Sequence, residues 1–155
     1  MRVVGKISIG NFIKNFLQIC YYFGIALLIL LPFILRKLGF NMSSCMFVIY
    51  PNGILLLLIT RNFIKLFDSL KNNKPFCKGN VKILKQTSLI SFIESIFWLI
   101  DLGYELLLVT STDIVFNTIL LFLNILFIGV AIALYILSEL FNQAYNYKKE
   151  NDLTI

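Results

Sequence analysis

Four long apolar stretches constrain this chain more than any other feature. They cover about residues 16–35, 47–67, 87–109 and 114–137, and each has roughly the 20 residues that a helix needs to cross a bilayer. Of the 155 residues, 59% are hydrophobic and 14% charged, which is outside the range of ordinary soluble domains. Because the stretches are continuous, a membrane β-barrel is excluded. The sequence therefore predicts an all-α integral membrane four-helix bundle, with residues 1–155 as a single transmembrane domain.

The basic residues predict the topology of these spans. Of the 14 lysine and arginine residues, only Arg36 and Lys37 lie between the first and second stretches, and none lies between the third and fourth. By the positive-inside rule, both termini and the central connection are expected to be cytoplasmic. The charges predict attraction to anionic lipids on that face, and the sparse aromatics among them argue against direct nucleic-acid binding. Residues 138–149 are expected to form a helical cytoplasmic extension.

The composition also limits the possible chemistry. The chain has no histidine, which excludes zinc or haem sites with a histidine ligand and any Ser-His or Cys-His dyad. Its three cysteines are predicted at different depths, without the spacing of a metal site. We therefore expect no enzyme, no cofactor, and no catalytic, cofactor-binding or metal-binding residues.

Three acids in the third stretch form one helical stripe, since Glu94, Asp101 and Glu105 are seven and four residues apart. A carboxylate in hydrocarbon costs roughly 3 kcal/mol, so the stripe is expected to face the protein interior. At about 1.5 Å per residue, Glu94 lies at the depth of Arg61, and Asp101 at the depth of Asn124. The candidate intramembrane polar network comprises Arg61, Glu94, Asp101, Glu105, Asn117 and Asn124.

This network has two interpretations. In the structural one, Glu94 pairs with Arg61 and Asp101 accepts hydrogen bonds from Asn124 or is protonated, so that polar contacts choose neighbouring helices. In the functional one, Glu94 and Asp101 line a proton or cation pathway in a small transporter or channel subunit. The oligomeric state is left open.

Two stretches resemble a known family. They are residues 70–76, with Asn80 and Leu84 after them, and residues 137–141, which lead to the ending 150–155. Together with length and span count, they are similar to DUF2975, a family of small bacterial four-span membrane proteins of unknown function. The resemblance covers essentially the whole chain. One departure is Gln143-Ala144, where the family often has a glycine.

The resemblance implies a non-enzymatic protein with a regulatory role through protein contacts, since family members are often encoded beside a small helix-turn-helix transcriptional regulator of the Cro type. A cytoplasmic loop and tail that could contact such a regulator form the candidate partner or packing surface. Its residues are Pro75, Phe76, Asn80, Asn151, Asp152, Leu153, Thr154 and Ile155. In the alternative interpretation, Leu153 and Ile155 pack back under the bundle beside Pro75 and Phe76.

Overall fold

The computed structural model describes residues 4–37, 42–71, 75–107 and 114–153. All four segments are helical: α1 is Val4–Lys37, α2 is Met42–Lys71, α3 is Lys78–Leu107 and α4 is Ile114–Leu153. The predicted all-α class and the four helices are confirmed. Pro51 lies inside α2 rather than ending it.

Three helices in the described part of the chain are long and apolar enough to cross a membrane. These segments are Gly10–Lys37, Lys78–Gly103 and Asn117–Asn151. The predicted second span, 47–67, falls on α2, which is not among them in the described residues. This helix carries Pro51-Asn52-Gly53 near one end and Arg61-Asn62 nearer the other, and these interrupt its apolar run.

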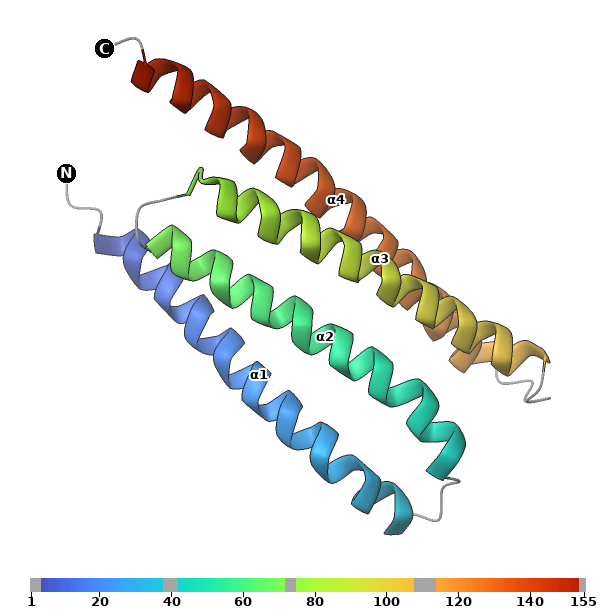
Figure 1. Cartoon of the computed structure of the whole chain (residues 1–155). Coiled ribbons are helices and arrows are strands. Elements are labelled where there is room, and N and C mark those ends of the chain that lie inside the picture. The colour runs from blue at the N-terminus through green and yellow to red at the C-terminus, as the bar shows by residue number, and fades with distance from the viewer. Residues whose placement is uncertain (1–3, 38–41, 72–74, 108–113, 154–155) are drawn as a thin grey trace.

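The helices form an open row rather than a closed bundle. Among the described residues, contacts between helices join α1 to α2, α2 to α3 and α3 to α4, and the last of these contacts is the most extensive. Figure 1 shows this order, with α1 at one edge and α4 at the other. α3 and α4 lie side by side as a hairpin, but α1 does not close the predicted bundle against α4 in this part of the chain.

The interior of the row is polar and its surface apolar. Buried polar residues outnumber buried hydrophobic ones, whereas large hydrophobic side chains are exposed along all four helices. None of the most apolar part of α1 is buried. In water this distribution would be unfavourable. In lipid, where helices gain no hydrophobic energy by associating, small and polar residues are the usual contacts between them.

Two glycines let α1 and α2 approach closely. A Cβ atom at Gly53 would lie 2.5 Å from Cδ2 of Leu28, and one at Gly24 would lie 2.9 Å from Cδ2 of Leu57. The Tyr50 hydroxyl donates a 3.1 Å hydrogen bond to the Leu28 carbonyl across the same contact. The α1–α2 contact therefore depends on leucine side chains resting on glycines.

Replacing Gly53 with leucine is expected to destabilise this contact, because its side chain would occupy the space of Leu28. Overpacking of this kind costs about 1–3 kcal/mol. The measurement is unfolding by SDS titration in lipid–detergent micelles. Gly129→Leu is the control, since a Cβ there meets nothing within 4 Å, and equal stability of the two variants would contradict the assignment.

One compact apolar cluster joins α2, α3 and α4. Leu66, Leu84 and Leu134 are buried together, and Leu84 is 1% exposed. The partly buried side chains around this cluster are Phe63, Ile83, Val130 and Phe141. It lies close to the beginning of α3, so it fixes the ends of the helices next to the connection between α2 and α3.

Candidate functional site

Two of the three acids in the stripe of α3, Glu94 and Asp101, face the protein interior, as predicted. Glu94 is fully buried and Asp101 is 7% exposed, and Thr87 and Ser91 on the same side of the helix are also buried. We call the buried polar residues between α2, α3 and α4 the polar seam. Its members are Asn52, Thr87, Ser88, Ser91, Glu94, Ser95, Asp101 and Asn124.

Asp101 is bound from α2. The side-chain amide of Asn52 donates a 2.9 Å hydrogen bond to Oδ2 of Asp101, and both residues are buried. The partner predicted from the sequence was Asn124, so the choice of partner is corrected. Taking Leu56 and Trp98 as the centres of the second and third apolar stretches, Asn52 lies about 6 Å and Asp101 about 4 Å from the centre toward the same side. Depth could therefore have identified Asn52 as a partner.

Asn124 and Ser88 fasten α3 to α4 through backbone carbonyls. The Asn124 amide donates to the Ser95 carbonyl at 2.6 Å, and the Ser88 hydroxyl donates to the Ala131 carbonyl at 2.7 Å. A backbone acceptor is reached across a helix interface only where the facing side chains are small. These bonds therefore set the register of the α3–α4 hairpin.

Glu94 has no hydrogen-bond partner in the described part of the chain. Both of its carboxyl oxygens are buried without one, as are the Ser91 hydroxyl and the Trp98 indole nitrogen on the same side of α3. The indole N–H lies near the Glu94 carboxyl but is not aligned for a hydrogen bond. A bare carboxylate in such a place is too costly to persist, so the site suits a neutral carboxylic acid.

The predicted pairing of Glu94 with Arg61 is wrong, because Arg61 is exposed and the carboxyl oxygens of Glu94 accept no hydrogen bond among the described residues. Rotation about the α2 axis is the reason. Asn52, Ile59 and Leu66, each seven residues apart, are buried on one face. Arg61 is two residues after Ile59 and so points about 160° away from that face. The depth of a residue along its helix does not give the direction in which its side chain points around the helix axis.

The remaining predicted network residues are Glu105 and Asn117. Asn117 is partly buried, and its side-chain oxygen has no partner among the described residues. The backbone of Glu105 belongs to α3, but its side chain lies outside the described residues. Across the described residues, no three Cys, Asp or Glu side chains form a group that could hold a metal ion.

Replacing Asn52 with alanine is expected to cost about 1–3 kcal/mol, because Asp101 would lose a buried donor. The measurement is SDS titration of the purified protein, with Asp101→Ala and the double variant completing a thermodynamic cycle. Asn62→Ala, almost three helical turns away from the contact along α2, serves as the control. Strict additivity of the two single changes would show that the Asn52–Asp101 bond contributes nothing.

The residues between α2 and α3 that were predicted as part of a partner or packing surface are built into the fold. The Asn80 side chain is 1% exposed and donates a 2.7 Å hydrogen bond to the Pro75 carbonyl. Phe76 contacts Phe141 of α4 edge to face, with ring centroids 5.2 Å apart. Leu84 belongs to the apolar cluster. The loop is thus a structural clamp between α3 and α4, although Phe76 remains 44% exposed.

The C-terminal part of the same predicted surface is only partly described. Asn151 is exposed in the last turn of α4, whereas the side chains of Asp152, Leu153, Thr154 and Ile155 lie outside the described residues, and so does the predicted back-packing of Leu153 and Ile155. Residues 142–153 continue α4 beyond Phe141 by about 18 Å. Figure 1 shows this extension running past the beginning of α3.

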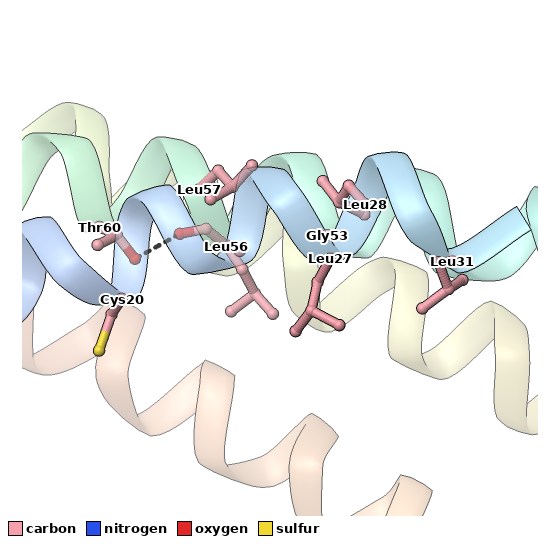
Figure 2. Close-up of a pocket in the computed structure, with 9 residues that line it drawn as sticks. Cys20, Leu27, Leu28, Leu31, Gly53, Leu56, Leu57 and Thr60 are labelled. Atoms are coloured by element: carbon pink, nitrogen blue, oxygen red, sulfur yellow. Dashed lines mark hydrogen bonds between the residues drawn. The ribbon is translucent and has the colours of Figure 1, made fainter. Parts of the chain in front are cut away.

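A hollow of about 290 Å³ lies between α1 and α2. Figure 2 shows leucines of both helices around it, with Cys20 and Thr60 toward one end. The Thr60 hydroxyl donates to the Leu56 carbonyl of its own helix at 2.9 Å. The lining is otherwise apolar, which suits a hydrocarbon chain rather than a polar ligand. Its residues are Cys20, Gly24, Leu27, Leu28, Leu31, Gly53, Leu56, Leu57 and Thr60.

Comparison with known proteins places the chain in a family. No curated protein and no solved structure matches it. The family model described as "Protein of unknown function (DUF2975)" matches residues 14–155, which include the acid stripe, the connection between α2 and α3 and the α4 extension. Because the match covers nearly the entire chain, the protein belongs to the DUF2975 family.

Proposed function

We propose that this protein is a non-enzymatic, multi-pass protein of a bacterial plasma membrane, with both termini cytoplasmic, that acts through contacts with a cytoplasmic regulator protein. The observation that supports this proposal best is the continuation of α4. Residues 142–153 extend beyond the clamp formed by Phe76 and Phe141 and are mostly exposed where described. A polar helix anchored at one end offers a surface on which a small protein can dock.

The polar seam has a structural part in this proposal. Buried hydrogen bonds from Asn52 and Asn124 hold α2 and α4 against α3, and the contact between Phe76 and Phe141 holds α4 where its extension begins. The basic residues near this end would attract anionic lipids, each contributing about 1 kcal/mol. Together these contacts would keep the α4 extension at a defined distance from the bilayer.

Co-purification tests the partnership. The chain would be co-expressed with a small helix-turn-helix regulator of the Cro type, the kind often encoded beside members of the family, then extracted in mild detergent and captured through an N-terminal tag. We expect the regulator to be retained by the complete chain and lost when residues 150–155 are deleted. Leu106→Ala, exposed near the other end of α3, is the control. Equal recovery with and without residues 150–155 would reject the tail as the contact.

Reporter fusions test the placement in the membrane. Green fluorescent protein at either terminus is expected to fluoresce, and alkaline phosphatase there is expected to be inactive. Phosphatase inserted between α3 and α4 should be active. Active phosphatase at the C-terminus would reverse the proposed orientation.

A second candidate function is a small transporter or channel subunit that uses Glu94 and Asp101. The Glu94 carboxyl and the Ser91 hydroxyl, one turn apart on α3 and both without a hydrogen-bond partner among the described residues, favour it. Purified protein in liposomes would be assayed with a pH-sensitive dye under an imposed potential. Proton flux that Glu94→Gln abolishes would support this candidate, and flux equal to that of empty liposomes would reject it.

A further inference from the structure

A second hollow, of about 380 Å³, lies between α3 and α4 and is lined by residues of these two helices. Its floor consists of Ser88 and Ala131, whose hydrogen bond draws the two helices together. Its walls are Leu89, Phe92 and Ile132, which are 61%, 50% and 57% exposed. Two small residues between larger apolar ones thus leave an apolar groove on the protein surface. Its lining suits a hydrocarbon chain. We call it the α3–α4 groove.

One end of the α3–α4 groove is cationic. The Lys85 ammonium lies there, 2.6 Å from a carboxylate oxygen of Glu139 and 5.9 Å from the centre of the Tyr135 ring. The Lys85 side chain is 47% exposed, and an ammonium has three donors. It can therefore hold Glu139 and still donate to a second anion. Tyr135, 53% exposed, is a residue type that prefers the membrane interface.

Two more lysines continue this end of the groove. Lys78 and Lys82 are exposed and lie seven and three residues before Lys85. In the other direction, Leu89 and Phe92 follow on the same side of α3. The surface thus changes from cationic to apolar within one stripe, and three lysines there outweigh the one carboxylate of Glu139. A ligand that matches this stripe has an anionic head and a hydrocarbon tail.

We propose that the α3–α4 groove binds one anionic phospholipid, with its phosphate at Lys82 and Lys85 and an acyl chain between Leu89, Phe92 and Ile132. This inference rests on the membrane placement proposed above. The hollow between α1 and α2 provides an internal comparison, because it is also apolar but no charged residue lines it. It should accept acyl chains without regard to their head group.

Fluorescence quenching by brominated lipids tests the site. Trp98 is the only tryptophan, so Trp98→Phe gives a dark background for one reporter at a time. Phe92→Trp reports on the α3–α4 groove, and Leu27→Trp on the α1–α2 hollow. Each protein is reconstituted in phosphatidylcholine vesicles that contain a fixed fraction of either brominated phosphatidylglycerol or brominated phosphatidylcholine.

The Phe92→Trp reporter is expected to be quenched preferentially by brominated phosphatidylglycerol, and the Leu27→Trp reporter equally by both lipids. Adding Lys85→Gln should lower the relative affinity for phosphatidylglycerol about fivefold, the effect of one lysine charge. Adding Glu139→Gln should raise it, since a competing anion is removed. A purely structural Lys85–Glu139 pair would instead make both changes act in the same direction. Lys37→Gln, at the end of α1, should have no effect.

Equal quenching of the Phe92→Trp reporter by the two lipids would overturn the site while leaving the membrane placement intact. Absence of quenching at both reporters would overturn the membrane placement, and the lipid site with it. Circular dichroism of each variant before reconstitution shows that the helices are retained, so loss of selectivity in a folded variant is assigned to the lysine.

Discussion

Replacing Glu94 with leucine is expected to raise the free energy of unfolding. The Glu94 carboxyl is fully buried, and neither oxygen has a hydrogen-bond partner among the described residues. Removing such a group ends its desolvation penalty, whereas leucine fills a similar volume with apolar atoms. Burying a polar group without a hydrogen bond costs about 1–3 kcal/mol, so replacing it with apolar atoms should recover a similar amount. SDS titration of the purified variant measures the change.

The control for this prediction is Asp101→Leu, which replaces a second buried acid of the same helix. Asp101 accepts a hydrogen bond from Asn52, so leucine there leaves a buried amide without its acceptor and should destabilise. Opposite signs at the two positions are the expected result. Destabilisation by Glu94→Leu as large as that by Asp101→Leu would mean that Glu94 holds a ligand or proton network that stabilises the fold.

Replacing Leu84 with alanine is expected to lower the free energy of unfolding by about 2–5 kcal/mol, the range for a buried leucine. Leu84 is 1% exposed and packs against Leu66 of α2 and Leu134 of α4. A cavity there removes contacts with two helices together, and those contacts lie close to the clamp of Phe76 and Phe141. The midpoint of SDS unfolding measures the loss.

Leu89→Ala is the matched control, because Leu89 is on the same helix but 61% exposed. It should change the unfolding midpoint little, because the Leu89 side chain lies mostly on the surface and its truncation leaves no internal cavity. If the two alanine variants unfold at the same midpoint, the Leu66–Leu84–Leu134 cluster does not hold the three helices together.

The sequence-based predictions of the site rested on helical periodicity and on depth along each helix. They do not include the rotation of one helix relative to its neighbour. The seven- and four-residue steps among the acids correctly placed Glu94 and Asp101 in the interior. Depth arithmetic brought Arg61 level with Glu94, but Arg61 points away from α3. The seven-residue repeat of Asn52, Ile59 and Leu66 marks the buried face of α2 and was the available signal. Combining depth with this repeat would have excluded Arg61.

The family motif between α2 and α3 was identified from the sequence, but its physical role was not. Asn80 is a polar residue in a turn-rich segment. That pattern is as typical of a solvated loop as of a loop packed against the helices. In the structure its side chain closes the loop onto the Pro75 carbonyl, and the next turn of α3 places Leu84 in the apolar cluster. Every residue has a backbone carbonyl, so residue types do not show which carbonyl accepts a hydrogen bond. The contact between Asn80 and Pro75 could therefore not be predicted from the sequence.

The sequence by itself determined the number of helices, the medium that suits them and the face of α3 that turns inward. Those properties follow from apolar length and from 3.6-residue periodicity, both of which are local. Only the tertiary structure decided that Asn52 rather than Asn124 binds Asp101, that Glu94 lacks a partner among the described residues, and that the helices stand in an open row. Those outcomes depend on the rotation of each helix about its own axis and on which neighbours it meets, and both are set by packing between distant segments.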